Sequence, residues 1–435
     1  MLTPDEKAVL RRIDDRKEEL VDCLRRLIRF RTVTPLFRGR AEGDDYAGLQ
    51  SFLSDRLAGL GFDVEMWEAD ASTLERFPGC GVVPDRDLSN MPILVARRER
   101  AGPSLLLNGH YDVVPPGVVT NWRHPPFDGV VENDRVFGRG ACDMKAGLAA
   151  IVEALRCVVE ANGEIPGTVV VESVPDEEMT SMGTLVCCQR DVRADAAIVP
   201  EPTDLQVLVA VRGSLGGRIV VSGRAGHSEM AQIPWRDGGP VNAISKAARV
   251  VEGLERLNAE WATRPDKRHR YLDPDTIVAT MIRGGEWDVM VPERVEITFD
   301  SMFVPSTKDK RAEIQAGLDS IAHDDDWMRD HPPVLEAGDY LYGAEIREDE
   351  PIVRAASAAL TDLGLESRFV GSGSLTDMVH LINYSKIPTV CVGPAARTAH
   401  AADECVTVDE LVTTTKALAL MILRWCGGPD RRRSG

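Results

Sequence analysis

The 435-residue sequence lacks three features that mark large classes of protein. Its formal net charge at pH 7 is −18, so it has no basic excess of the kind with which nucleic-acid-binding proteins displace counterions. It contains no apolar run near the roughly 18–20 residues that a membrane-spanning helix needs. Its N-terminal segment also lacks the uninterrupted apolar stretch of a secretory signal. We therefore expect neither a nucleic-acid partner nor a membrane partner.

Two kinds of motif are missing as well. The nine cysteines are scattered without a CxxC pair, and an odd number without a secretory signal favours reduced thiols in the cytoplasm. No GxGxxG follows a predicted strand, and Lys145 is followed by Ala rather than by the Ser or Thr of a P-loop, which excludes a nucleotide-binding oxidoreductase. With 43% hydrophobic and 28% charged residues, the chain can form two or three globular domains.

Short apolar runs predict buried strands that alternate with helical patterns. Strands are predicted at 93–96, 104–107, 168–171, 196–199 and 389–392, and helices at 5–30, 45–60, 148–161 and 351–364. This alternation is typical of an α/β fold with a mixed, largely parallel sheet flanked by helices.

The pattern changes after Pro202. Residues 206–224 and 276–304 predict alternating strands, with helices near 240–258 and 308–322, and residues 323–342 resemble a linker. These features predict an inserted α+β domain at 208–335, whereas 1–207 and 336–435 form one domain that carries the predicted site.

Four predicted strands each lead to a side chain that can bind a metal ion. The strand at 104–107 leads to His110, and the strand at 168–171 leads to the acidic run 176–178. The strand at 196–199 leads to Glu201, and the strand at 389–392 leads to His400. Because ligands of open α/β sheets bind beyond the carboxyl ends of the strands, these side chains are expected to line one crevice. Imidazoles combined with carboxylates suit Zn, Mn or Co.

Each of these residues has an ordinary alternative when it is taken alone. The run 176–178 could be a solvated charge cluster, Asp143 could cap the helix that follows it, and His227 could be structural. The metal site is favoured because all of the segments fall at equivalent edges of one predicted sheet.

The motifs that carry these residues resemble those of the M20 family of metallopeptidases and deacylases, over nearly the whole chain. They are GHYDVVP at 109–115, GRGACDMKAG at 138–147, DEE at 176–178, PEPT at 200–203 and AHAADE at 399–404. Within that family, GGEW at 284–287 and TDM at 376–378 are similar to the branch of acetylornithine deacetylase and succinyl-diaminopimelate desuccinylase.

The resemblance implies two divalent metal ions per chain, Zn, Co or Mn. Asp143 would bridge them, His110 and Glu201 would complete one position, and Glu178 and His400 would complete the other. Asp112 would hydrogen-bond the far nitrogen of His110 and fix its tautomer. Glu177 would be the general base.

The resemblance also implies a role for the inserted domain as a lid and dimerisation domain. The chain would then form a homodimer through the lid, and His227 would reach the substrate oxyanion, in relatives from the partner subunit. Relatives have a cis peptide after the bridging Asp, here Asp143–Met144.

Two positions of the lid depart from the family pattern. Relatives carry a motif like NVVP and, 13 residues after its Asn, an Arg, and these two residues often hold a substrate carboxylate. The matching residues here are Val289 and Met302. Arg283 or Arg212 could take over this substrate contact. Otherwise the substrate is not a typical N-acyl amino acid.

The function implied is hydrolysis of a C–N amide bond in a small molecule, such as an N-acyl amino acid, by metal-activated water. Three alternatives stay open: an aminohydrolase that releases ammonia from a non-peptide amine, aromatic amines included; a dipeptidase or carboxypeptidase; and a non-catalytic metal-binding module. The presence of Glu177 argues against the last, because a site that only binds metal needs no base.

Overall fold

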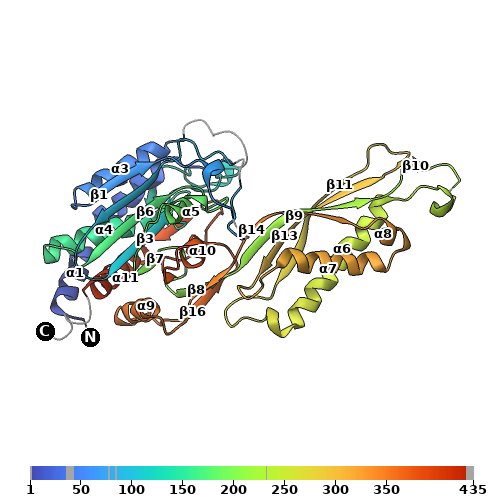
Figure 1. Ribbon diagram of the computed structural model, residues 1–435. Coiled ribbons are helices and arrows are strands. Elements are labelled where there is room, and N and C mark those ends of the chain that lie inside the picture. Colours follow the sequence, from blue (N-terminus) through green and yellow to red (C-terminus); the bar gives the residue numbers. More distant parts are fainter. Residues whose placement is uncertain (1, 36–43, 77–78, 84–85, 232, 428–435) are drawn as a thin grey trace.

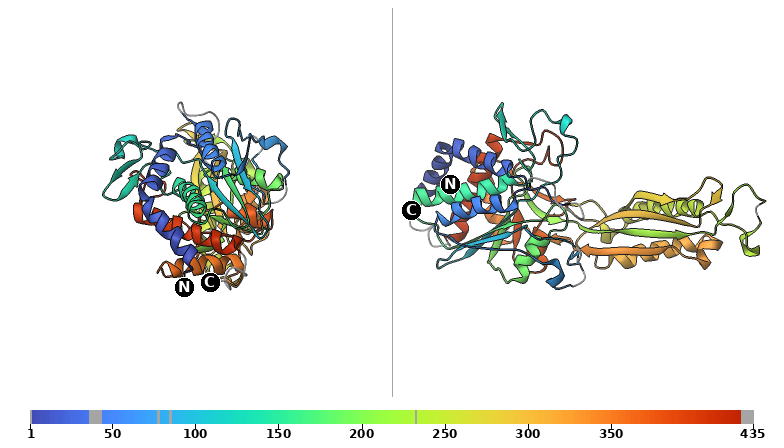
Figure 2. Two further views of the ribbon diagram at one scale, coloured as in Figure 1. Left: turned by 90° about the vertical axis from the view of Figure 1, so that its left-hand side faces the viewer. Right: turned by 90° about the horizontal axis from the view of Figure 1, so that it is seen from above.

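The computed structural model describes residues 2–35, 44–76, 79–83, 86–231 and 233–427. The chain forms a larger body built around a central sheet and a narrow body that projects from it (Figures 1 and 2). Among the described residues, no helix combines the length and the apolar character that crossing a bilayer requires.

The larger body is built on a nine-stranded mixed sheet. The order is β1 (Asp63–Trp67), β2 (Ile93–Arg98), β6 (Thr168–Val174), β3 (Ser104–His110), β7 (Ala196–Val199), β17 (Thr389–Cys391), β8 (Val207–Val211) and β15 (Ala344–Glu345), and β16 (Phe369–Ser372) also pairs with β8. The four central strands run parallel, because β3 pairs in parallel with β6 and β7, and β17 pairs in parallel with β7. Their carboxyl ends therefore meet at one edge, and the expected fold class is confirmed.

Helices cover both faces of this sheet. One face packs against α1 (Pro4–Asp15), α2 (Lys17–Arg29), α3 (Tyr46–Ala58), α4 (Lys145–Asn162), α9 (Pro351–Asp362) and α11 (Val408–Cys426). The other packs against α5 (Met182–Gln189) and α10 (Met378–Asn383). Leu105 and Leu107 face the first layer, and Leu106 faces the second. Because both faces are buried, β3 reads as a continuous apolar run.

The prediction of a single helix over 5–30 was wrong. Two helices form instead, and they meet at Arg16, whose φ of −106° and ψ of 20° leave the helical region. The apolar spacing continues through this bend because both helices pack against the same core, so periodicity alone does not reveal the break.

The projecting body, which we call the lid, is a four-stranded antiparallel sheet covered by helices. Its strand order is β11 (Thr276–Gly284), β13 (Arg294–Phe303), β9 (Gly213–Ser222) and β14 (Val334–Leu341). The helices α6 (Ala243–Thr263), α7 (Lys310–His323) and α8 (Asp326–Asp330) pack on one face of the sheet. Two short sheets complete the fold: β10 (Gly226–His227) with β12 (Met290–Val291), and β4 (Val130–Glu132) with β5 (Arg135–Phe137) and β18 (Cys405–Thr407).

The structure changes two expectations for the inserted segment. Residues 323–342 are not a linker, because they contain α8 and the edge strand β14; a half-exposed edge strand gives only a weak alternation in the sequence. The chain passes between the sheets at Arg212 and again after Leu341, whereas the sequence placed the boundaries at 207/208 and 335/336. The apolar run through 207–222 conceals this switch because it supplies strands to both sheets.

The two connections to the lid touch each other through glycines. A Cβ atom on Gly213 would lie 2.6 Å from the backbone nitrogen of Gly343, and a Cβ atom on Gly343 would lie 2.7 Å from that of Gly213. Since real Cβ atoms do not approach backbone this closely, the crossing requires glycine on both chains.

Candidate metal centre

His110 ends β3 and is fully buried. Its Nδ1 atom lies 3.0 Å from the backbone oxygen of Asp112, so an Nδ1–H group can donate to this carbonyl. That hydrogen bond selects the tautomer whose Nε2 atom is free to bind a metal ion.

Asp112 supports the site in a different way from the one expected. Its carboxylate lies 3.6 Å from Nδ1 of His110, and it accepts hydrogen bonds from the backbone N–H groups of Glu177 (3.2 Å) and Glu178 (3.3 Å). The carboxylate therefore holds the acidic turn, and the backbone oxygen of Asp112 orients the imidazole.

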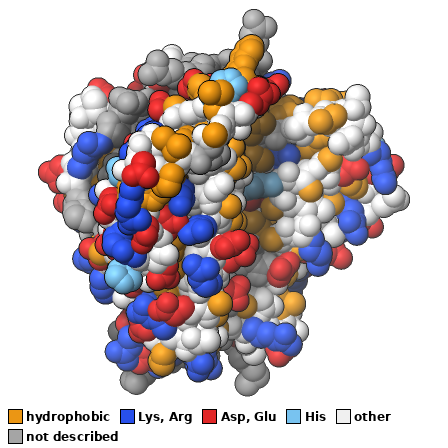
Figure 3. All heavy atoms as spheres, turned by 90° about the vertical axis from the view of Figure 1, so that its right-hand side faces the viewer, with side chains coloured by type: hydrophobic (Ala, Val, Ile, Leu, Met, Phe, Trp, Pro, Cys, Tyr) orange, Lys and Arg blue, Asp and Glu red, His pale blue; other side chains and the backbone are white. Residues whose placement is uncertain are grey.

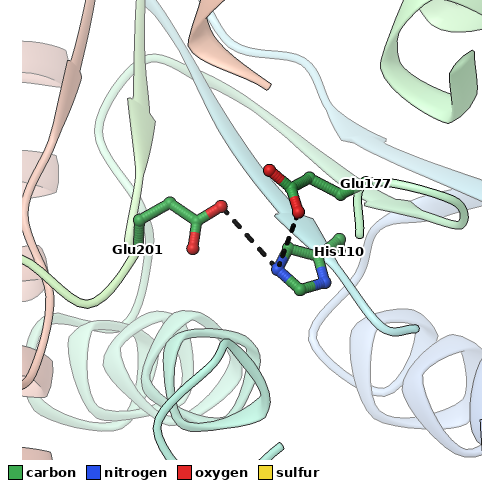
Figure 4. A group of neighbouring side chains, drawn as sticks. All are labelled: His110, Glu177 and Glu201. Atoms are coloured by element: carbon green, nitrogen blue, oxygen red, sulfur yellow. Dashed lines mark ion pairs between the residues drawn. The ribbon is translucent and has the colours of Figure 1, made fainter. Parts of the chain in front are cut away.

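Three carboxylates converge on Nε2 of His110. Asp143 Oδ1 lies 3.3 Å away, and Glu177 Oε2 and Glu201 Oε1 each lie 3.7 Å away. Figure 4 shows the Glu177 and Glu201 side chains approaching the ring from the loops that follow β6 and β7. Both loops start at the carboxyl edge of the parallel strands, as the topology predicts.

Asp143 faces a second histidine with its other oxygen. His400 Nε2 lies 3.4 Å from Asp143 Oδ2 and 2.9 Å from Glu178 Oε2. Because Oδ1 of Asp143 points to His110 and Oδ2 points to His400, this carboxylate stands between two groups of potential ligands. The Asp143–Met144 peptide bond is cis.

The crowding of acids and imidazoles shifts their pKa values. Burial raises the pKa of Glu178 to about 7, and burial also raises the pKa values of Glu177 and Glu201 well above their ordinary value. Hydrogen bonds with Asp143 and Glu178 raise the pKa of His400 to about 10. Burial would lower the pKa of His110, but the charges of Glu201 and Glu177 raise it well above its ordinary value.

The residues fit two divalent cations. His110 forms one group of potential ligands with Glu177 and Glu201, and another with Asp143 and Glu178; within each group the ligand atoms lie within 4.8 Å of one another. Among the described residues, Glu178 Oε1 and Glu201 Oε1 are buried without a hydrogen-bond partner. Buried anionic oxygens of this kind are stabilised by a metal ion.

The structure does not bring His227 to this centre within one chain. His227 is exposed in β10, at the end of the lid that lies farthest from β3 (Figure 1). Val289 lies beside it, since its carbonyl accepts from the backbone N–H of Ser228 at 2.9 Å.

The remaining substrate-binding candidates lie along the lid. Met302 is half-buried on β13 near the connection to the larger body, whereas Arg283 is exposed on β11 opposite Glu296. Arg212 is buried, and its Nη2 atom donates to the backbone oxygens of Pro274 (2.8 Å) and Met302 (3.1 Å). These bonds tie Nη2 of Arg212 to the lid backbone, and a substrate contact of Arg212 stays a prediction.

Sequence reasoning missed three buried residues around the centre. Glu404 and Arg139 form an ion pair behind Asp143, and Asp377 is fully buried near the acidic cluster, where burial raises its pKa to about 7. Arg139 and Glu404 stand inside two of the motifs that carry the predicted ligands, and Asp377 stands inside TDM at 376–378. Each is a charged residue of a motif to which the sequence analysis gave no role, and this was the available signal.

The comparisons with known proteins agree with this geometry. Residues 106–424 match the sequence profile described as Peptidase family M20/M25/M40. The chain is 29% identical to N-formyl-4-amino-5-aminomethyl-2-methylpyrimidine deformylase of Bacillus subtilis, over 96% of each chain. It is 28% identical to succinyl-diaminopimelate desuccinylase of Alkalilimnicola ehrlichii, over 94% of this chain and 100% of that one.

Solved structures share the fold. The dipeptidase Dug1p from Saccharomyces cerevisiae superposes with a TM-score of 0.71 at 15% identity, over 98% of this chain and 99% of that one. The YXEP protein of Bacillus subtilis, described as a dinuclear metal-binding peptidase, gives a TM-score of 0.62 at 15% identity, over 94% of this chain and 98% of that one.

Proposed function

Because the chain belongs to the Peptidase family M20/M25/M40 and is a hydrolase of carbon–nitrogen bonds, we propose that it removes a short acyl group, of formyl size, from the amine of an aromatic or uncharged small molecule. The observation that carries this choice is Met302, which stands where the family resemblance expects an Arg that holds a substrate carboxylate. Arg212 is the candidate nearest to Met302 for binding a substrate carboxylate in place of that Arg. Its Nη2 atom already donates hydrogen bonds to backbone oxygens of the lid. Two relatives named as deformylases of an aminomethylpyrimidine match over 96% of the chain.

The residues of the centre divide the chemistry between them. Asp143, His110, Glu201, Glu178 and His400 would hold two divalent ions, for which we propose Zn, Co or Mn. Such ions supply Lewis acidity and make water nucleophilic at neutral pH. Glu177 accepts the proton of the attacking water and delivers it to the leaving nitrogen. Burial raises the pKa of Glu177 well above its ordinary value, which makes the carboxylate a better proton acceptor than an exposed glutamate.

We also propose that two copies of the chain pair through their lids in the cytoplasm. The strand β11 is one of the two outer strands of the lid sheet and exposes Val278, Met281 and Ile282. Figure 3, seen from the lid end, shows hydrophobic side chains gathered among charges of both signs. A second copy would cover this edge and could bring its His227 to the first copy's centre. The nine free cysteines fit a reducing compartment.

A substrate panel tests the proposed activity. Purified enzyme with added Zn, Co or Mn is assayed on an N-formyl aminomethylpyrimidine, N-acetyl aromatic amines, acetylornithine, succinyl-diaminopimelate and dipeptides. We expect the highest kcat/KM on the N-formyl aromatic amine. Efficient turnover of acetylornithine or succinyl-diaminopimelate would contradict the proposal, and release of ammonia from an unacylated amine would indicate an aminohydrolase.

The variant Met302→Arg tests the substrate contact. It is expected to lower kcat/KM on the preferred aromatic substrate about tenfold or more, because a guanidinium would replace apolar surface. Met66→Arg, at an exposed position of β1 in the larger body, is the matched control and should leave kcat/KM unchanged. Equal kcat/KM values for Met302→Arg and wild type would show that Met302 does not contact the substrate.

A further inference from the structure

A buried ion pair lies directly behind the bridging carboxylate. Arg139 Nη1 lies 2.6 Å from Glu404 Oε2, and both side chains are almost completely buried. The other oxygen of Glu404 accepts hydrogen bonds from the backbone N–H groups of Cys142 (3.0 Å) and Asp143 (3.2 Å). Glu404 therefore fixes the backbone from which the Asp143 carboxylate projects.

The same arginine reaches the second histidine. Arg139 Nη2 donates to the backbone oxygens of His400 (3.2 Å) and Pro115 (3.3 Å), and its guanidinium lies 5.2 Å from the centre of the Trp122 ring. His400 needs such support, because its φ of 62° lies in the left-handed region. Its side chain is also 52% exposed, whereas the side chain of His110 is fully buried.

The two metal positions share Asp143, but their histidines are supported by different parts of the chain. The imidazole of His110 is oriented by the backbone oxygen of Asp112. Within the described part of the chain, the hydrogen bonds of Arg139 and Glu404 lead to other residues. The His400 position depends on a loop that Arg139 ties to the backbone of Asp143 through Glu404. Loss of the ion pair should therefore disturb one metal position more than the other.

We propose that Arg139 and Glu404 are positioning residues that set the metal affinity of the position formed by Glu178 and His400. This inference rests on the two-metal site of the proposed function. Partners that orient metal ligands typically contribute about 10–100-fold to metal affinity. We expect the Arg139→Met variant to weaken binding at this position by that factor and to change the His110–Glu201 position much less.

The test is a titration of the metal-stripped full-length protein with Co²⁺. Binding is measured by calorimetry and by visible absorption. Arg139→Met and Arg139→Lys are compared with wild type, and His400→Ala identifies the signal of the His400 position. Arg139→Lys should recover part of the affinity, because an ammonium can pair with Glu404 but cannot also span both backbone oxygens. The matched control is Arg424→Met, which breaks another 2.6 Å ion pair, with Glu6, between α11 and α1.

The outcomes separate this inference from the proposed function. Selective weakening at the His400 position in Arg139→Met, with both affinities unchanged in Arg424→Met, would support it. Wild-type affinity at both positions in folded Arg139→Met, or equal loss at both, would overturn it. If Arg139→Met does not fold, Glu404→Gln is measured instead against the same criteria. Failure of wild type to bind a second Co²⁺ ion would overturn the two-metal site together with this inference.

Discussion

At the scale of single residues, the neighbouring carboxylates of Glu177 and Glu178 have different proposed roles in the centre. Glu177 and Glu178 are adjacent in sequence, and both receive backbone support from Asp112, yet Glu177 faces His110 and Glu178 faces His400. Because their partners differ, we expect substitution of Glu177 to lower turnover and substitution of Glu178 to lower metal content.

Glu177→Gln should retain both metal ions and lose most turnover. A missing general base typically lowers kcat about 10²–10⁴-fold. Metal content is measured by elemental analysis and kcat is measured on the best substrate of the panel. Glu178→Ala is the comparison variant, and it should bind one ion fewer. A Glu177→Gln enzyme with wild-type kcat would show that this carboxylate is not the base.

Glu172 should make the folded state less stable as the pH rises. Burial raises its pKa to about 7, although a hydrogen bond from Asn108 (2.8 Å) opposes the shift. Between about pH 4.5 and 7 the folded chain therefore holds a proton that the unfolded chain has released. The contribution is fully present below pH 4.5 and is lost as the pH passes through 7, and it amounts to about 3 kcal/mol.

Denaturant unfolding at several pH values checks this prediction. The Glu172→Gln variant mimics the protonated side chain, so its free energy of unfolding should fall less than that of wild type between pH 5 and pH 8. Parallel pH profiles for the two proteins would contradict the assignment.

At the scale of secondary-structure elements, the buried parallel strands were the most predictable part of the chain. The apolar runs at 104–107 and 168–171 are buried on both faces, so composition alone identifies them. The buried parallel strands also predicted where the ligand residues lie, because each ligand except Asp143 follows the carboxyl end of one of them. The edge strand β14 and the bend at Arg16 were missed because tertiary packing, rather than local periodicity, determines them.

The substrate contacts were the least predictable part of the site. The role of Arg212 depends on its bonds to Pro274 and Met302, which are distant from it in sequence and come together only when the lid strands pair. The same holds for the Arg139–Glu404 pair, whose members are separated by 265 residues.

A buried charge cluster joins the elements at the base of the lid. Asp275 Oδ2 lies 3.1 Å from Lys267 Nζ and 3.0 Å from Lys310 Nζ, and the ammonium of Lys310 lies 3.1 Å from the centre of the Trp261 ring. Both lysines and Asp275 are almost completely buried. Asp275 thus pairs with two buried cations, and Glu313 on α7 pairs with the same two lysines at 2.5 Å and 3.5 Å.

Asp275→Ala should destabilise the lid strongly. Removing one member of a buried ion pair typically costs about 3–5 kcal/mol, and Lys310 would here be left with the more distant carboxylate of Glu313, at 3.5 Å. Asp273→Ala, at an exposed position two residues earlier, is the control and should stay within about 0.5 kcal/mol of wild type. Thermal and urea unfolding of the three proteins give the comparison.

At the scale of the whole molecule, one chain does not place every proposed site residue together. The metal ligands lie in the larger body, while His227 and Val289 lie at the far end of the lid. In the dimer proposed above, His227 of one copy would lie close to the metal ligands of the other copy.

Sedimentation velocity tests the dimer. Wild type should sediment as a dimer at micromolar concentration, and Ile282→Asp on the exposed edge of β11 should raise the dimer dissociation constant about tenfold or more, because a charge would be buried at the contact. Val131→Asp, an exposed position of β4 in the larger body, is the control. A monomeric wild type would refute the pairing, and an unchanged Ile282→Asp dimer would place the contact elsewhere.

The position of α11 has a consequence for how the protein is made. This last helix packs between α1 and α4, and Arg424 pairs with Glu6 across 418 residues of chain. His400 precedes the helix by only a few residues. Because His400 and α11 follow the first ligands and the entire lid in the chain, the core of the larger body and the full set of proposed ligands can form only after both have been synthesised. A metal ion bound before that point would be held by only part of this set.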